Sequence, residues 1–254
     1  MIEKWKLALK EFLRDYEEDD DVIGAILYGS YASDNYNENS DIDVYLILKD
    51  SVNYHERGNI ESNSYLIEYF KNPVRKIKDY MEDEFSVNKL VTANMFAYGK
   101  IIYDIEGKVK ELQDLALDYI DKPIKHIASN KLDNNNYYIW NYLDELKTAL
   151  KEERSDFNLI YYHLLDYIYD AYLEYLSLPK IPRAKRFKIL TDENYRKNYH
   201  IFKLPEKEFI KLYLNCFIED KKSNMFKNIN DLVDYYYKKQ GGFNIRNFNM
   251  KEKI

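Results

Sequence analysis

The chain has 254 residues, a net charge of −6 and 27 tyrosines, and 46% of its residues are hydrophobic when tyrosine is included. This length allows one large domain or two modest ones, each with a real core. A single cysteine, Cys216, excludes an intramolecular disulfide, and its apolar surroundings predict a buried side chain rather than a nucleophile. No apolar run approaches the roughly 18 residues of a membrane-spanning helix, and the charged N-terminus does not resemble a signal peptide, so we expect a cytoplasmic protein without a membrane span.

The first half of the chain alternates between helical and strand-like patterns. Residues 2–17 place apolar side chains at helical spacing, and the acidic run Glu17–Asp21 after them is expected to be a solvated helix end. A short helix is expected to open at Ser30, residues 49–62 are predicted to be a connection, and Asn72-Pro73 predicts a helix cap. The expected strands span residues 22–28, 42–48, 64–70 and 100–103, and the later helices span 74–85, 88–98 and 108–120.

The second half changes character after residue 123, because it has almost no strand signals and no glycine before Gly241. Residues 240–254 are expected to be weakly ordered unless they dock. We therefore predict an α+β fold, with a mixed sheet and flanking helices over residues 1–110 and an all-helical bundle over residues 111–254. Helical patterns cover residues 124–151, 156–176, 184–198, 205–217 and 229–238.

The most informative stretch joins the first two strands. Gly29 and Ser30 end one apolar run, and Asp41 and Asp43 open the next. Strand alternation places both carboxylates on one face, with alpha carbons about 7 Å apart. Carboxylates that converge repel each other unless a cation neutralises them, and Mg²⁺ is typically bound by one or two carboxylates plus substrate phosphates. The turn can offer backbone N–H groups and a hydroxyl to a phosphate. The pattern predicts metal-assisted phosphoryl chemistry on a nucleotide. The alternative interpretation is that Asp41 and Asp43 are only an N-cap or turn pair at a solvated strand end.

These residues carry a family resemblance. Gly29-Ser30, ten intervening residues and Asp41-Ile42-Asp43 resemble the signature of the polymerase-beta-like nucleotidyltransferase superfamily, and more narrowly that of small bacterial antibiotic nucleotidyltransferases. Ala32 and Ser40 also match the local form in those enzymes, whereas Ser33-Asp34 replaces their Arg-Gly pair. The resemblance extends to a helical C-terminal domain, and it implies that this domain lies on the acceptor side.

A third carboxylate is needed for two metal ions, or for one metal ion and a base, and Glu68 is the candidate. Glu68 lies inside a strand of aromatic and aliphatic residues, where an unpaired charge is costly. In the family, a glutamate on the strand after the Asp-x-Asp strand is the third metal ligand or the general base, and Ile67-Glu68 matches that context. The alternatives are an edge-strand glutamate that faces water, and Glu61 as the third acid.

The resemblance implies roles for these residues. Asp41, Asp43 and Glu68 would be catalytic and would hold Mg²⁺, while the Gly29-Ser30 turn and Ser40 would bind the nucleotide. The basic run 183–188 is expected to be a solvated helix start, and its alternative is a phosphate contact by Lys185 or Arg186. The four histidines have no metal-ligand spacing, so a zinc site is not expected.

Charge is distributed unevenly along the chain. Residues 1–104 hold 12 Lys and Arg against 21 Asp and Glu, so the expected catalytic half has a net charge of −9. Nucleic acid substrates usually require a basic footprint, so this half favours a small and possibly cationic acceptor. We predict transfer of a nucleoside monophosphate from a nucleoside triphosphate, with ATP first, to a small-molecule hydroxyl, with release of pyrophosphate.

The resemblance implies an aminoglycoside- or lincosamide-like antibiotic as the acceptor, and hence a role in antibiotic resistance. Two alternatives stay open. The acceptor can be a protein side chain or a tRNA end, or the protein can be a non-catalytic binder of a nucleotide or a partner. The sequence leaves the oligomeric state open.

Overall fold

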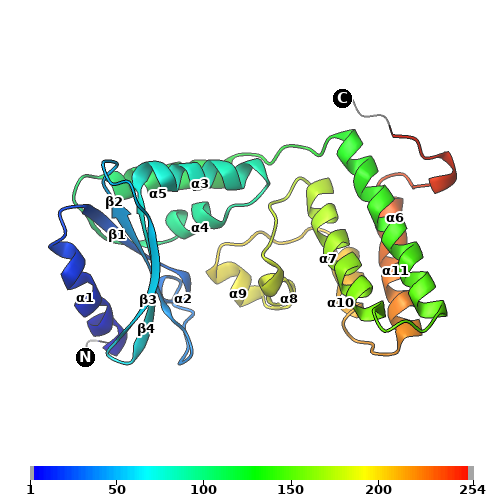
Figure 1. The fold of residues 1–254 in the computed structure, drawn as a ribbon, viewed down its shortest axis with the longest axis horizontal. Helices are drawn as coiled ribbons and strands as arrows, with labels where there is room; N and C mark the ends of the chain where they lie inside the picture. The colour runs from blue at the N-terminus through cyan, green and yellow to red at the C-terminus, as the bar shows by residue number, and fades with distance from the viewer. Residues whose placement is uncertain (1–2, 251–254) are drawn as a thin grey trace. The chain divides into compact units, whose positions relative to one another are not determined.

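The computed structural model describes residues 3–250, which divide between two compact units (Figure 1). The first unit comprises the chain up to residue 122 together with residues 192–201. The second comprises residues 123–191 and the chain from residue 202 onward. Among the described residues the first unit holds all the strands and the second is helical, which confirms the predicted α+β class.

The first unit is built on a five-stranded mixed sheet in the order β3-β4-β2-β1-β5. The neighbours β2 and β4 run parallel, and the other neighbouring pairs run antiparallel. The strands are β1 (Val22–Tyr28), β2 (Ile42–Leu48), β3 (Glu56–Ser62), β4 (Tyr65–Pro73) and β5 (Lys100–Asp104). The helices of this unit are α1 (Lys4–Glu17), α2 (Gly29–Ala32), α3 (Val74–Ser86), α4 (Val91–Ala97), α5 (Lys108–Asp121) and α9 (Glu193–Asn198).

Each face of the sheet carries its own apolar core. On one face, Trp5, Phe12 and Leu13 of α1 pack against alternate residues of β1 and β2. On the other face, α3, α4 and α5 pack against the remaining residues of the same strands (Figure 1). Burying one such large apolar side chain contributes about 1.5–3 kcal/mol. Because β1 and the body of β2 are covered on both faces, they form a rigid support for the residues at their ends.

Residues 49–62 are not simply a connection, as predicted, because β3 forms within them. This strand is mostly exposed and polar, so its sequence shows no apolar alternation. It pairs antiparallel with β4 through a turn at Asn63 and Ser64, whose φ angles are 47° and 66°. Positive φ at both central residues is what a tight type I′ hairpin turn requires. The formation of β3 therefore depends on its pairing with β4 and on the hairpin turn, and not on an apolar pattern of its own side chains.

The expected domain boundary at residue 110 falls inside α5. Val109, Leu112 and Ala116 of this helix belong to the core of the sheet, so the first compact unit extends to residue 122. Residues 192–201 also pack in this unit, where the ring of His200 stacks on Tyr98 at a centroid distance of 4.0 Å. The assignment of acceptor binding to the second part of the chain stays a prediction.

The second unit is a helical bundle whose core is rich in tyrosine. Its elements are α6 (Ser129–Lys151), α7 (Phe157–Tyr175), η1 (Arg183–Lys185), α8 (Arg186–Thr191), α10 (Lys207–Asn215), α11 (Lys222–Lys239) and η2 (Ile245–Asn247). The fully buried tyrosines are Tyr161, Tyr169, Tyr172, Tyr213 and Tyr236. Cys216 is buried as predicted, and burial raises the pKa of its thiol to about 12.

Several elements differ in their bounds from the sequence prediction, and α11, for example, begins at Lys222 and not at residue 229. The expected helix over 184–198 is broken at Asp192, whose side chain accepts a hydrogen bond from the Tyr195 N–H at 2.9 Å and caps α9. Asn72 does not cap α3, whose N-cap residue is Pro73, and the Asn72 amide N–H donates to the Tyr45 hydroxyl at 2.8 Å. In the C-terminal tail, Phe248 stacks on Tyr137 at 5.5 Å, so part of the tail is docked. Residue 2 of the first expected helix and residues 251–254 of the tail lie outside the described residues.

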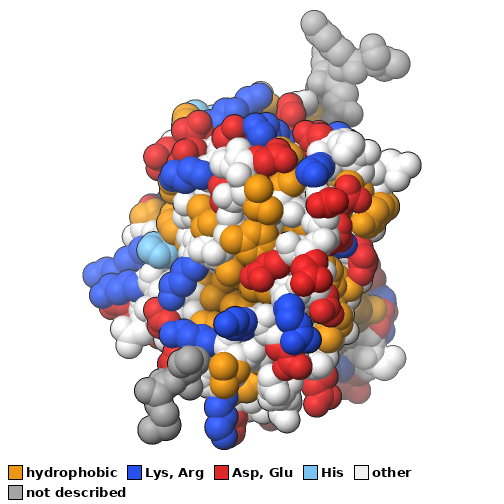
Figure 2. Space-filling model, turned by 90° about the vertical axis from the view of Figure 1, so that its left-hand side faces the viewer, with side chains coloured by type: hydrophobic (Ala, Val, Ile, Leu, Met, Phe, Trp, Pro, Cys, Tyr) orange, Lys and Arg blue, Asp and Glu red, His pale blue; other side chains and the backbone are white. Residues whose placement is uncertain are grey.

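The surface beside α1 shows acidic and basic side chains interspersed around an apolar band (Figure 2). Among the described residues, no helix is both long enough and apolar enough to cross a membrane.

Candidate active site

Three carboxylates converge where β2 begins and β4 runs beside it. Asp43 is the second residue of β2, and in the parallel register it lies opposite Glu68 of β4. Asp41 precedes β2 by one residue. Asp41, Asp43 and Glu68 are each partly buried, and each offers an oxygen that lies within 4.8 Å of the oxygens of the other two. Alternation along β2 and the parallel register of β4 thus bring together the three acids that the sequence singled out.

The turn after β1 lies directly against this cluster. Tyr28, the last residue of β1, pairs with Asp43 across the sheet, and Gly29 follows with a φ of 70°. A Cβ at position 29 would lie 2.0 Å from Oδ2 of Asp43, far inside van der Waals contact. Glycine is therefore needed here both for the backbone conformation and for the close approach to the carboxylate.

Ser30 carries a hydroxyl that the described part of the chain leaves without a hydrogen-bond partner. Its Oγ is buried. A buried hydroxyl without a partner is costly, so its presence next to the acids calls for an explanation such as a ligand. Ser30 is one of the residues that the sequence predicted to bind the nucleotide.

The Ser33-Asp34 pair stands where the enzymes that the motif resembles carry Arg-Gly, and the backbone explains how it fits. Asp34 has a φ of 54°, a left-handed conformation that glycine adopts freely and that aspartate tolerates. The Ser33 hydroxyl donates to the carbonyl of Gly29 at 3.0 Å, so it stabilises the turn itself. Asp34 pairs with Lys100 at 3.0 Å on the exposed surface. The loop therefore keeps its shape without the glycine.

Arg57 and Tyr28 are two neighbours of the acids. Arg57 of β3 donates from Nε to Oε1 of Glu68 at 3.1 Å, and its Nη2 donates to the same oxygen. Burial, with the charges of Asp43 and Glu68 nearby, raises the pKa of Tyr28 far above its ordinary value, so this hydroxyl stays protonated. Arg57 was not among the predicted site residues, because it lies in the stretch that was predicted to be a connection.

The structure shows the local surroundings of the other candidate residues, of which Ser40 directly precedes Asp41 in the chain. Glu61, the alternative third acid, is exposed on β3 and is not part of the cluster. The Ser40 hydroxyl accepts a hydrogen bond from the Asn37 N–H at 2.9 Å within an exposed turn. Lys185 is exposed in η1, which belongs to the second unit.

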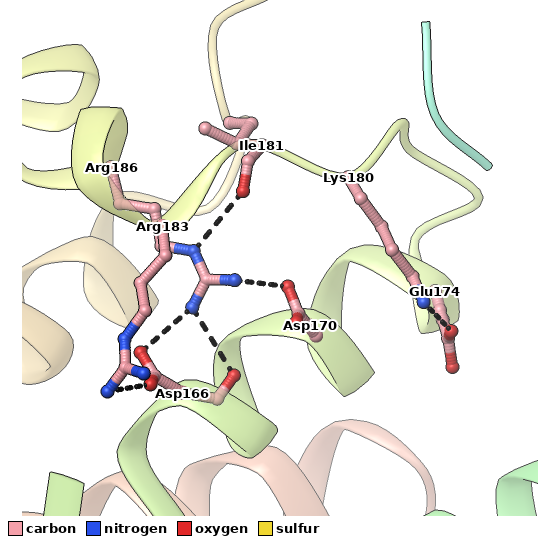
Figure 3. A network of polar contacts seen from close by, with 7 residues as sticks. All are labelled: Asp166, Asp170, Glu174, Lys180, Ile181, Arg183 and Arg186. Carbon is pink, nitrogen blue, oxygen red and sulfur yellow. Dashed lines mark hydrogen bonds and ion pairs between the residues drawn. The ribbon is translucent and has the colours of Figure 1, made fainter. Parts of the chain in front are cut away.

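Arg186 is not a free phosphate contact. Its side chain is only 7% exposed and pairs with Asp166 and Asp170, as Figure 3 shows. It also donates to the carbonyl of Ile181 at 3.3 Å. These contacts attach the segment before α8 to α7, so Arg186 has a structural role in the second unit.

Comparison with known proteins gives the family. The sequence pattern of the polymerase beta nucleotidyltransferase family matches residues 8–107. A protein of Methanocaldococcus jannaschii, provisionally named a protein adenylyltransferase, is 31% identical over 100 residues, which cover 36% of this chain and 79% of that protein. The chain belongs to the polymerase-beta-like nucleotidyltransferases. Its family membership confirms the resemblance to this superfamily, and the protein is a nucleotidyltransferase enzyme.

A solved structure also resembles this nucleotidyltransferase. It is a nucleotidyltransferase-like protein from Exiguobacterium sibiricum, with a TM-score of 0.48 and 8% sequence identity. The similarity covers 93% of this chain and 75% of the other.

Proposed function

We propose that this nucleotidyltransferase moves a nucleoside monophosphate from a nucleoside triphosphate, with ATP as the first candidate, to a hydroxyl group of a small molecule, and releases pyrophosphate. The reaction would depend on a divalent cation, with Mg²⁺ as the first candidate. The observation that carries the proposal is the convergence of Asp41, Asp43 and Glu68 within 4.8 Å, beside the glycine turn.

The donor set fits such a cation. Mg²⁺ is a hard cation that prefers oxygen ligands and keeps sites open for water and substrate phosphates. Asp41 and Asp43 would hold it, and Glu68 would either complete the site or take the proton of the acceptor hydroxyl. When bound, the cation neutralises negative charge on the phosphate groups and orients them for an in-line displacement.

The turn after β1 would hold the phosphates. Gly29 brings the backbone against Asp43 without a side chain in the way, and the partnerless Ser30 hydroxyl could donate to a phosphate oxygen. Ser40 and Lys185 stay candidates for further nucleotide contacts.

The acceptor is proposed from charge and from family. The net charge of −9 over residues 1–104 favours a cationic small molecule, and an aminoglycoside-like or lincosamide-like antibiotic has a suitable hydroxyl. We place this reaction in the cytoplasm. A protein hydroxyl is the second candidate acceptor, because the relative from Methanocaldococcus jannaschii is named for protein adenylylation. That similarity covers 36% of this chain, so it bears on the reaction more than on the acceptor.

One experiment tests the reaction and separates the acceptors. The protein is incubated with each α-labelled nucleoside triphosphate, Mg²⁺ and a panel of aminoglycosides and lincosamides, while pyrophosphate release is followed. Label transferred to a small molecule supports the first candidate, and label retained on a protein band in a gel supports the second.

The variant Asp43→Asn should lower the rate at least about a hundredfold, since a lost metal ligand removes several kcal/mol of charge stabilisation. The matched control is Glu61→Gln, which removes an exposed carboxylate outside the cluster and should leave the rate unchanged. Turnover that survives in Asp43→Asn, or that is lost in Glu61→Gln instead, would contradict the proposed site.

A further inference from the structure

Arg57 makes the ion pair with Glu68. Arg57 lies on β3 opposite Phe70, and Glu68 lies two residues earlier on β4, so the two side chains are diagonal neighbours across the strand pair. A long side chain can reach such a neighbour. The Arg57 Nε lies 3.1 Å from Oε1 of Glu68, and Nη2 donates to the same oxygen. The guanidinium therefore fixes one oxygen of the carboxylate.

A second contact fixes the guanidinium itself. Its central carbon lies 4.9 Å from the centroid of the Phe70 ring. Phe70 in turn stacks on Tyr45 of β2 at 5.5 Å, so the ring that supports the arginine is held by the core of the sheet. A planar guanidinium can stack on an aromatic ring and donate two hydrogen bonds at once, which a lysine ammonium cannot do.

The pairing leaves the other side of the carboxylate available. Both donors of Arg57 meet Oε1, and within residues 3–250 Oε2 of Glu68 accepts no hydrogen bond. The Glu68 side chain is 21% exposed, while that of Arg57 is 65% exposed. Paired with this more exposed arginine, the acid still offers an oxygen within 4.8 Å of those of Asp41 and Asp43.

Charge gives a reason for a cation at this place. Three carboxylates within 4.8 Å carry a formal charge of −3, and the guanidinium brings the sum of the four groups to −2. Without the arginine, Glu68 could rotate away from the two aspartates to lower their mutual repulsion, because it is partly exposed.

We propose that Arg57 is a positioning residue of the nucleotidyltransferase site, which orients Glu68 so that its free oxygen completes a divalent metal site with Asp41 and Asp43. This inference rests on the proposed function. Hydrogen-bond partners of metal-binding carboxylates usually contribute about 10–100-fold to metal affinity or activity. A simpler role is that Arg57 only keeps the exposed edge strand from pairing with other chains, and that role would leave metal affinity unchanged.

The test measures Mn²⁺ binding to the full chain by titration calorimetry, so it needs neither nucleotide nor acceptor. We expect Arg57→Gln to weaken Mn²⁺ binding about tenfold and Arg57→Lys to weaken it less, because lysine keeps the charge but loses the double donation. Added guanidinium ion should restore part of the affinity of Arg57→Gln and should not affect the other variants. Rescue of this kind is not expected of a residue that only supports the fold.

The control Arg14→Gln removes an exposed arginine from α1 and should bind Mn²⁺ like the parent protein. Thermal unfolding of each variant identifies any that fail to fold. If Arg57→Gln fails to fold, Mn²⁺ binding by Arg57→Lys still decides the test. If Arg57→Gln and Arg57→Lys fold and bind Mn²⁺ as tightly as Arg14→Gln, the positioning role is wrong.

Asp43→Asn separates this inference from the proposed function. If it loses Mn²⁺ binding while both Arg57 variants keep it, the metal site stands and only the role of Arg57 fails. If Asp43→Asn also binds Mn²⁺ normally, the metal does not bind at this cluster and both are wrong.

Discussion

Gly29 and Gly107 share a left-handed backbone but differ in what surrounds them. Their φ angles are 70° and 72°. A Cβ at position 29 would lie 2.0 Å from Oδ2 of Asp43, whereas a Cβ at position 107 would have no atom within 4 Å. The two positions therefore separate the cost of backbone strain from the cost of displacing the Asp43 carboxylate.

Gly29→Ala should abolish or strongly reduce metal binding and nucleotidyl transfer, whereas Gly107→Ala should reduce neither. Each substitution should lower the free energy of unfolding by about 1–3 kcal/mol, because alanine is strained at positive φ. Displacing Asp43 by about 1 Å should in addition lower the transfer rate about a hundredfold. Mn²⁺ affinity, pyrophosphate release and urea unfolding of both variants check this. Equal activity losses in the two variants would mean that strain, not contact with Asp43, is responsible.

The grouping of the three acids of the candidate site could be predicted from the sequence, but the residues around them could not. Asp41 and Asp43 follow from strand alternation, and Glu68 follows from the cost of a charge within an apolar strand. Arg57 could not be found in this way, because its strand has no apolar pattern of its own. A hairpin signal at Asn63-Ser64 would have been the clue, since an antiparallel partner for β4 places Arg57 diagonally from Glu68.

At the scale of elements, the acidic run after α1 is more than a solvated helix end. Asp19 accepts a hydrogen bond from the Asp21 N–H at 3.0 Å and pairs with Lys71 of β4 at 3.0 Å. The Lys71 side chain is only 7% exposed, so this contact ties the end of α1 to the sheet. The backbone N–H of Asp21 and then the Lys71 ammonium lower the pKa of Asp19 below its ordinary value of 3.8.

The lowered pKa of Asp19 predicts a specific acid dependence. A carboxyl group whose pKa is depressed in the folded state adds stability above its ordinary pKa, and that stability is lost as the pH falls through the lower, folded-state pKa. Asp19→Asn should therefore be less stable than the parent by about 0.5–1.5 kcal/mol at pH 7, and the difference should shrink as the pH falls below 3.8. Urea unfolding at a series of pH values between 7 and 3 measures this. The exposed neighbour Asp20→Asn is the control, and a gap that does not shrink in acid would contradict the assignment.

The elements that the sequence predicted best are those that the core alone determines. The bounds of β1 and β2 agree with the expected strands, because both are continuous apolar runs covered on two faces. The expected helix over 184–198 failed at Asp192, where a local side-chain cap begins a new helix. Helix caps and the partner strands of hairpins depend on single contacts, and the periodicity of apolar residues in the sequence does not reveal such contacts.

At the scale of the whole molecule, the first unit is formed by two separate segments of the chain. Residues 192–201 belong to it, although the segments on either side of them belong to the second unit. The two apolar cores of the sheet are nevertheless built entirely from residues before 122. The three acids and Arg57 also lie before residue 122.

A fragment of residues 1–122 should therefore fold cooperatively and bind Mn²⁺ within about threefold of the full chain, because a domain of about 120 residues with two covered sheet faces buries enough surface to be stable. It should lose acceptor-dependent pyrophosphate release if the helical unit binds the acceptor. Urea unfolding checks that the fragment folds, calorimetry checks its Mn²⁺ affinity, and the transfer assay checks its pyrophosphate release. The same fragment carrying Asp43→Asn is the control for metal binding. A fragment that stays unfolded would show that residues 192–201, including the stack of His200 on Tyr98, are required for the first unit to fold. A folded fragment that fails to bind Mn²⁺ would instead place part of the metal site in the second unit.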